Sequence, residues 1–283
     1  MQADLAHTKV RPPAVAGQFY PGDPKRLRTE VAELLADAPV SVNASTKALI
    51  VPHAGYVYSG HVAATAFAGL QDRAHAIKRV VLIGPAHYVP LEGIALPTVD
   101  AFETPLGPVP LDRDALALIA DLPSVTAANT PHVPEHALEV ELPFLQTLLN
   151  DFAVVPLLVG ESTPKEVADV LRRLWGGPET LIIVSSDLSH YHDYDTARRL
   201  DSATAAAIEC ADWARLRPGD ACGFLAVAGL LVEVNRRGLR AKRLLMCNSG
   251  DTAGSRDRVV GYGTWTFEEE QRVQRGQAEH SRR

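Results

Sequence analysis

Short runs of β-branched and leucine residues alternate along the chain with longer segments of helical period, and this alternation constrains the fold most strongly. The runs are nearly continuous in apolar residues, so both faces of each strand are expected to be covered. Strands are predicted over 48–51, 80–83, 154–159, 181–184, 243–246 and 259–267. The pattern predicts an α/β fold, with a mixed, largely parallel central sheet flanked by helices on both faces.

Signals that start and stop helices fall between these strands. Asp23 stands before a proline and is predicted to be an N-cap, and Thr163 opens a predicted capping box. Asp220 is predicted to cap a helix over 221–237 that ends at Gly238, a residue favoured just beyond a helix. Further helices are predicted over 61–71, 112–121, 136–150 and 195–209.

Composition narrows the class of protein. The chain has 283 residues and a formal net charge of −6, without a cluster of Lys and Arg that would suit nucleic acid. Its apolar stretches are too short to span a bilayer and its start does not resemble a signal peptide, so we expect a cytoplasmic protein that binds neither membrane nor nucleic acid. One domain is predicted over 11–267, between a flexible N-terminus, 1–10, and a flexible polar tail, 268–283.

Three of the predicted strands run directly into polar residues. His53, His87 and the pair Asp187 and His190 each follow a different apolar run. Ligands bind beyond the carboxyl ends of parallel strands in open α/β sheets. If these strands are parallel neighbours, the four side chains converge on one pocket. The alternative for each histidine alone is a core or surface imidazole whose hydrogen bonds are satisfied.

Cys222 is the cysteine that we interpret as functional. The chain has three cysteines and no C-x-x-C pair, which fits neither a disulfide framework nor a zinc ribbon. Cys222 follows the predicted N-cap, Asp220, and is therefore predicted to lie in the first turn of a helix, where the helix dipole favours a thiolate. Two imidazoles with such a thiolate make a three-ligand metal site that leaves positions open. The alternative is a small apolar residue that packs a helix start.

Six blocks in this order resemble the Memo family, whose bacterial members are called AmmeMemoRadiSam system protein B. The blocks span most of the chain and read VPHAGYVYSG, IGPAHYVPL, EHALEVELPFL, VPLLVG, SSDLSHYH and DACGFLAVAGLL. Memo proteins are similar in fold to class III extradiol (LigB-type) dioxygenases, whose non-haem iron is held by two His and a Glu. The resemblance therefore implies a dioxygenase-like fold with a mononuclear metal pocket.

The resemblance also implies roles for particular residues. His53, His87 and Cys222 match the metal-binding trio of the family. The SSDLSH block supplies Asp187 and His190 as the catalytic residues, and His190 resembles the acid/base histidine of the dioxygenases. A cysteine stands where the dioxygenases have a carboxylate, and its softer thiolate suits iron, zinc or copper(I).

Three further residues are implied to contact substrate or to support the metal ligands. His136 and Glu139 match the family's EHS-x-E-like element, and Tyr56 belongs to the first block. From the residues alone, a structural role is equally well supported. The acidic residues around His136 would then form the first turn of a helix, where their charge complements the helix dipole.

These features allow three functions. The first is a metal-dependent redox enzyme for a small substrate, with iron as the expected metal and copper or zinc as alternatives. The second is a metal-free enzyme with Cys222 as nucleophile and a histidine as base. The third is a binding or adaptor protein, since animal Memo proteins are associated with receptor-derived peptides. The family name also implies an AMMECR-type protein and a radical S-adenosylmethionine protein as partners.

Overall fold

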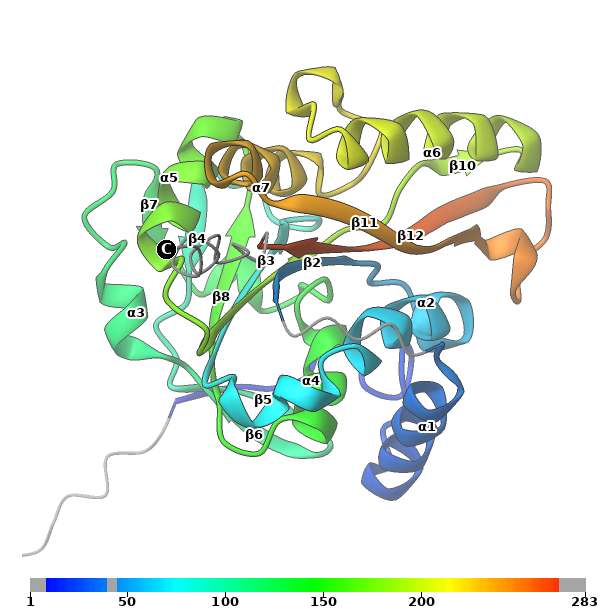
Figure 1. Cartoon of the computed structure of the whole chain (residues 1–283). Coiled ribbons are helices and arrows are strands. Elements are labelled where there is room, and N and C mark those ends of the chain that lie inside the picture. Colours follow the sequence, from blue (N-terminus) through cyan, green and yellow to red (C-terminus); the bar gives the residue numbers. More distant parts are fainter. Residues whose placement is uncertain (1–8, 40–44, 270–283) are drawn as a thin grey trace, which may run out of the picture.

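A nine-stranded mixed sheet forms the centre of the computed structural model, which describes residues 9–39 and 45–269 (Figure 1). Its strands are β2 (Thr46–Val51), β3 (Arg79–Pro85), β4 (Ile94–Leu96), β7 (Val125–Ala127), β8 (Ala153–Val159), β9 (Thr180–Ser185), β10 (His190–His192), β11 (Arg240–Asn248) and β12 (Val259–Glu268). They follow the order β10-β12-β2-β9-β3-β8-β4-β7, and β11 pairs with β12. The mixed sheet expected from the sequence is confirmed.

The four central strands, β2, β9, β3 and β8, are parallel to one another. They are buried along nearly their whole length, which accounts for their near-continuous apolar sequence. β12 is antiparallel to β2, β10 and β11, and β4 is antiparallel to β8. All six predicted strands are present, whereas short strands such as β4, β7 and β10 have too few residues to show a period.

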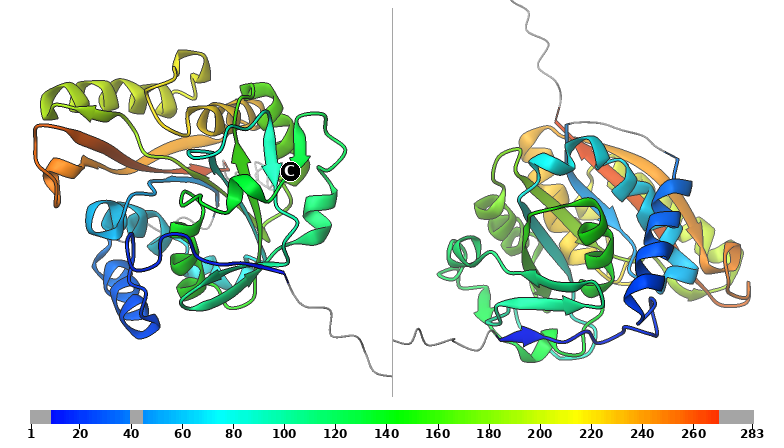
Figure 2. Two further views of the ribbon diagram at one scale, coloured as in Figure 1. Left: turned by 180° about the vertical axis from the view of Figure 1, so that it is seen from behind. Right: turned by 90° about the horizontal axis from the view of Figure 1, so that it is seen from below.

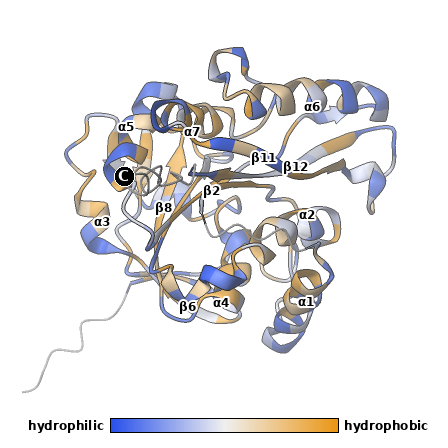
Figure 3. Ribbon diagram, viewed as in Figure 1, coloured by the Kyte–Doolittle hydropathy of each residue, from blue (hydrophilic) through white to orange (hydrophobic). Residues whose placement is uncertain are grey.

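Helices cover both faces of this sheet (Figures 1 and 2). On one side lie α1 (Pro24–Asp37), α2 (Tyr56–Ala68) and α4 (Leu142–Leu148), and on the other α5 (Pro164–Leu174), α6 (Tyr194–Glu209) and α7 (Phe224–Arg237). The remaining helices are α3 (Arg113–Ala117) and the 3-10 helices η1 (Gln71–Ala76), η2 (Thr130–His132), η3 (Glu139–Glu141), η4 (Trp213–Arg215) and η5 (Ser249–Asp251). Figure 3 shows hydrophobic residues along the central strands, where the core lies.

A second, three-stranded sheet lies at one end of the molecule. It has the order β1-β5-β6 and consists of β1 (Val10–Arg11), β5 (Ala101–Thr104) and β6 (Gly107–Pro110). Val10 and Glu268 both lie in strands, so regular structure extends slightly beyond the predicted domain, 11–267. Most of the two predicted flexible termini lies outside the described residues. No helix in the described ranges has the length and apolar character needed to cross a membrane.

Several predicted helix ends are confirmed. The Asp23 carboxylate accepts a hydrogen bond from the Arg26 amide at 2.8 Å, and Thr163 forms the capping box of α5. Gly238 follows α7 in the left-handed conformation, with φ of 71°. This conformation has little steric cost for glycine.

Two helix predictions are wrong in their first turns. The helix predicted over 136–150 begins as an α-helix only at Leu142, because Pro143 lacks an N–H and its ring clashes with the carbonyl four residues earlier. Likewise, α7 begins at Phe224 behind Gly223, and Asp220 does not cap it. Asp220 instead accepts a hydrogen bond from the amide of Arg217 at 2.7 Å.

Candidate metal centre

The carboxyl ends of three parallel neighbours position the polar residues of the site. His53, His87 and Asp187 each lie two residues beyond the end of a strand, namely β2, β3 and β9. A cavity of about 620 Å³ lies at this edge of the sheet. It is lined by His53, His87, His136, Asp187, His190 and Cys222, together with aromatic residues. The structure thus brings together the residues that the strand ends and the cysteine block predict.

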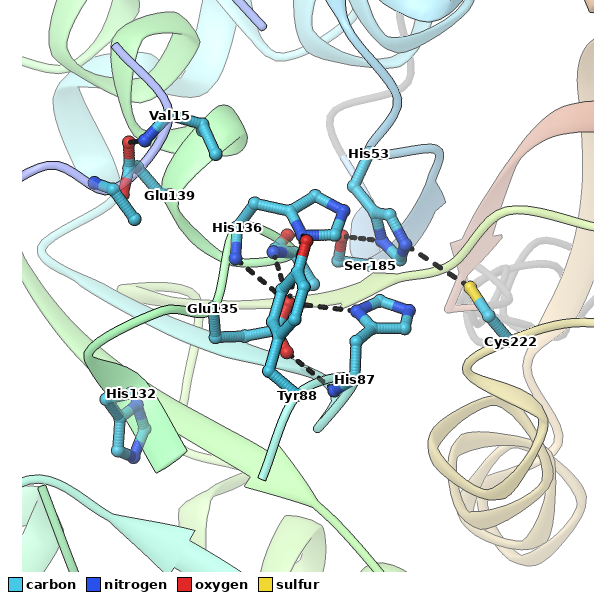
Figure 4. A network of polar contacts seen from close by, with 12 residues as sticks. Val15, His53, His87, Tyr88, His132, Glu135, His136, Glu139, Ser185 and Cys222 are labelled. Atoms are coloured by element: carbon cyan, nitrogen blue, oxygen red, sulfur yellow. Dashed lines mark hydrogen bonds and ion pairs between the residues drawn. The ribbon is translucent and has the colours of Figure 1, made fainter. Parts of the chain in front are cut away.

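Three histidines form the centre of this cavity (Figure 4). One potential ligand atom from each of His53, His87 and His136 lies within 4.8 Å of the others. The rings of His87 and His136 are stacked, with centroids 5.0 Å apart, and His53 meets both rings edge-on. The arrangement of three nitrogen donors around one point is suited to a metal ion such as zinc, iron or copper.

His53 is held by the end of β9. Its Nδ1 lies 2.8 Å from Ser185 Oγ, and its backbone N–H donates to Asp187 Oδ1 at 2.8 Å. Burial, reinforced by the nearby His87, lowers the pKa of His53 to about 3. The imidazole is therefore neutral at pH 7, and a hydrogen bond from Nδ1 to Ser185 leaves the Nε2 lone pair for a ligand.

Glu135 positions His87. One of its oxygens accepts from the His87 backbone N–H at 2.6 Å, and the other lies 2.9 Å from His87 Nδ1. Burial raises the pKa of Glu135, but hydrogen bonds from His87 and from the amide of Ala137 outweigh it and lower the pKa to about 2. The ionised carboxylate favours a proton on Nδ1, so Nε2 of His87 is available as a ligand.

His136 comes from the loop between η2 and η3. Its Nδ1 lies 3.2 Å from Tyr88 Oη and 3.3 Å from Glu135 Oε1. Burial and the neighbouring His53 lower the pKa of His136 to about 4, so this imidazole is also neutral at pH 7. The sequence assigned His136 to substrate contact or ligand support, whereas the structure places it in the histidine cluster.

Cys222 lies at the edge of the same cluster. Its Sγ is 3.2 Å from His53 Nε2, and the amide of Asp187 donates to the sulfur at 3.3 Å. Because α7 begins only at Phe224, Cys222 is not in a first helical turn. Burial, and then the charge of Asp187, raises the pKa of the thiol to about 12. The prediction that the helix start favours a thiolate is wrong, since desolvation dominates here.

The predicted acid/base pair lines the cavity as well. His190 Nδ1 lies 2.8 Å from the carbonyl oxygen of Leu188, so Nδ1 donates and Nε2 is left to exchange a proton. The pKa of the buried Asp187 is raised by desolvation, against the opposing effect of His190. Asp187 therefore accepts a hydrogen bond from the His53 backbone, and the nearby His190 offsets part of the effect of burial on its pKa.

Glu139 and Tyr56 do not line the cavity. The Glu139 carboxylate is buried and accepts from Arg11 Nη1 at 2.6 Å and from Tyr20 Oη at 2.7 Å. Tyr56 Oη donates to the carbonyl oxygen of Val140 at 2.8 Å. Through these contacts, both residues hold in place the segment that carries His136, without lining the cavity themselves. His136 lies in the loop before η3 and Glu139 begins that 3-10 helix, so neither lies in an α-helix as the prediction over 136–150 requires.

Three residues near the metal centre were not singled out from the sequence. Ser185 is the last residue of β9, so the strand-end rule that selected Asp187 could have found it. Glu135 and Tyr88 stand directly beside His136 and His87 in the chain. No spacing motif marks them, because the loop that folds Glu135 under His87 has no regular period.

The protein is thus an α/β protein with a candidate metal site. Neutral imidazoles lie beside a thiol at the ends of its parallel strands. Comparison with known proteins gives the family. The model of the Memo-like protein family matches residues 11–266, and the chain belongs to that family.

Relatives of full length agree with this assignment. The chain is 34% identical over 274 residues to a MEMO1 family protein of Archaeoglobus fulgidus, covering 91% of this chain and 99% of the relative. It is 34% identical over 268 residues to one from Aquifex aeolicus, with 90% and 97% covered. A MEMO1 family protein of Methanosarcina barkeri is 35% identical over 267 residues, with 89% and 98% covered.

Proposed function

We propose that the chain binds a single transition metal ion through His53, His87 and Cys222 and uses it in redox chemistry on a small molecule. The observation that carries the proposal is the set of donors in one cavity. Three ring nitrogens lie within 4.8 Å of one another, and Cys222 Sγ lies 3.2 Å from His53 Nε2. Iron fits a site of imidazoles with one thiolate, and copper or zinc are the alternatives.

The surrounding residues fit such a site. Ser185 forms a hydrogen bond with Nδ1 of His53, and Glu135 forms one with Nδ1 of His87. Each bond fixes the ring and directs its Nε2 toward a ligand. Burial keeps His53 and His136 neutral, as ligands must be, and a thiol releases its proton when it coordinates. His136 is either a further ligand or a side chain that lies beside the bound ion without coordinating it. A bound ion would supply Lewis acidity and electron transfer.

His190 and Asp187 are the groups proposed to handle protons. With Nδ1 bonded to the Leu188 carbonyl, His190 can take or give a proton only at Nε2. Asp187 keeps the backbone of His53 in place, next to His190 in the lining of the same cavity. The class III dioxygenases, which Memo proteins resemble in fold, use a comparable histidine.

A metal-free thiol enzyme is less well supported. The contact between Cys222 and His53 has the geometry of a thiol–imidazole pair. However, burial raises the pKa of the thiol to about 12 and lowers that of the imidazole to about 3, so the proton stays on sulfur. The adaptor function, and partnership with AMMECR-type and radical S-adenosylmethionine proteins, stay predictions from the family resemblance.

Anaerobic iron titration of single variants tests the proposal. Wild type should bind one equivalent of iron, and His53→Ala or Cys222→Ala should weaken binding by about 10-fold or more, because each removes a proposed ligand. The exposed His75→Ala is the matched control and should bind as wild type does. Equal binding by Cys222→Ala would remove the sulfur from the site, and loss of binding in His136→Ala would assign the third position to nitrogen.

A further inference from the structure

A second, larger cavity adjoins the candidate metal centre. Its volume is about 1060 Å³, and it lies at the carboxyl ends of β3 and β8 beside the start of α7. His87, Tyr88 and Cys222 line both this cavity and the smaller one that contains His53. Two of the proposed metal ligands thus border both cavities, and a molecule in the larger cavity could contact them without lying against His190, which lines only the smaller cavity.

The wall of the larger cavity is mainly apolar. Val89, Pro90 and Leu91 follow β3 on one side, and Phe224 and Leu225 begin α7 on the other. A cavity of this size with apolar walls and a few polar groups is typical of sites for small organic molecules. The wall therefore favours a ligand with an apolar body.

Glu92 and Glu161 give the cavity its charge. They are the carboxylates among its lining residues, and none of those residues is a lysine or arginine. The two residues are paired in a parallel bridge, and both are exposed. Within residues 9–39 and 45–269, neither carboxylate forms an ion pair.

The backbone holds Glu92 and Glu161 at paired positions. The Glu161 amide donates to the Leu91 carbonyl oxygen and the Gly93 amide to the Glu161 carbonyl oxygen, each at 2.7 Å. A Cβ at Gly160 would lie 2.0 Å from the Leu91 oxygen, so only glycine allows this close crossing. Like charges on paired strand positions repel each other, and a cation placed between them would relieve that repulsion.

We infer that the larger cavity binds an organic cation, an amine with an apolar body whose ammonium group lies at Glu92 and Glu161. Its apolar body would extend between Leu91 and Leu225 toward His87 and Cys222. The inference rests on the proposed function in one respect, since it names the class of molecule presented to the metal. An anionic ligand is the rival, because Gly223 leaves the start of α7 without a side-chain cap.

Binding of simple probes to the metal-free protein tests the inference. Calorimetric titration at low ionic strength would compare n-octylamine, which is a cation at pH 7, with octanoate and octanol. Octylamine should bind most tightly of the three. In Glu92→Gln combined with Glu161→Gln, its affinity should fall by about 10-fold, while that of octanol should not change.

A second pair of substitutions controls for net charge. Glu33→Gln combined with Glu103→Gln removes two exposed carboxylates far from the cavity lining, and octylamine should bind this variant within about 2-fold of wild type. Octanoate binding as tightly as octylamine, undetectable binding of octylamine, or equal loss in both double variants would each overturn the inference.

The same probes separate this inference from the proposed function. His53 does not line the larger cavity, so His53→Ala should bind octylamine as wild type does while losing iron. Iron binding without octylamine binding would refute the cation site alone. Octylamine binding in a protein that takes up no iron would refute the metal site alone.

Discussion

Glu135 is the residue on which the geometry of the three histidines depends most. Its two oxygens accept from the backbone and Nδ1 of His87 and from the amides of His136 and Ala137. A single buried carboxylate therefore sets both the tautomer of His87 and the position of the loop that carries His136. Groups that orient metal ligands in this way contribute strongly to metal affinity.

Glu135→Gln should lower metal affinity by about 10- to 100-fold. The amide nitrogen of Gln would replace one of the oxygens that now accept hydrogen bonds from His87, His136 and Ala137. Anaerobic titration with ferrous ion measures the effect, and a melting curve by circular dichroism confirms that the variant is folded. The exposed Glu33→Gln serves as the control. Unchanged affinity in a folded Glu135→Gln protein would show that this carboxylate does not orient the ligands.

Arg11 and Glu139 form a buried ion pair behind the site, with 2.6 Å between Arg11 Nη1 and Glu139 Oε2. Arg11→Met should destabilise the protein by about 3–5 kcal/mol, since it leaves a buried carboxylate without its partner. Urea unfolding measures this, with Arg113→Met, from an exposed pair, expected to cost at most about 1 kcal/mol. Loss of metal affinity without loss of stability would instead assign Glu139 to the metal site.

Three of the site residues predicted from the sequence directly follow the end of a strand. His53, His87 and Asp187 were predicted because parallel strands deliver whatever follows them to one edge of the sheet. The position of Glu139 could not be predicted in this way, because it follows from contacts with the distant Arg11. The place of His136 in the histidine cluster could not be predicted for a similar reason, since a loop without a period positions this residue.

At the scale of elements, the start of α7 positions Cys222 against β9. Gly223 packs so closely that a Cβ there would lie 2.8 Å from Ser186 Cβ and 3.0 Å from the Ser185 carbonyl oxygen. The close contact explains why the helix starts later than its sequence signals suggest. The residues before α7 are held by the segment that follows β9, through bonds such as that from the Cys222 amide to the Asp187 carbonyl oxygen at 3.2 Å.

Gly223→Ala should therefore push Cys222 away from His53. We expect a loss of about 1–3 kcal/mol in the free energy of unfolding, as for other overpacked sites, together with weaker metal binding. Gly22→Ala is the matched control, because the nearest atoms to its added Cβ would be 3.4 Å away. A Gly223→Ala protein with wild-type stability and affinity would mean that this contact does not position the cysteine.

At the scale of the whole molecule, the alternation of apolar runs predicted the parallel centre of the sheet but not its edges. The antiparallel pairing of β12 with β2 joins segments more than 200 residues apart in the chain, and no local pattern specifies it. Burial along the sheet also has a consequence for stability. Lys47 in β2 is 5% exposed, and its Nζ donates to the carbonyl oxygens of Gly177 and Thr180, each at 2.7 Å.

Burial lowers the pKa of Lys47 to about 8. Between pH 8 and about 10 the unfolded chain keeps this proton more than the folded protein does. The unfolded state then binds more protons, so the contribution of Lys47 to stability rises with pH across this window. Urea unfolding at several pH values should show a steeper rise for wild type than for Lys47→Met, and parallel curves would contradict this pKa shift.

Elemental analysis tests the central claim most directly. Protein purified without oxygen, loaded with ferrous ion and desalted under nitrogen would be compared with His53→Ala combined with His87→Ala. The account predicts one equivalent of iron per wild-type chain and close to none in the double variant, because two of the proposed ligands are missing. Wild-type protein that retains no metal, or equal metal content in both proteins, would contradict it.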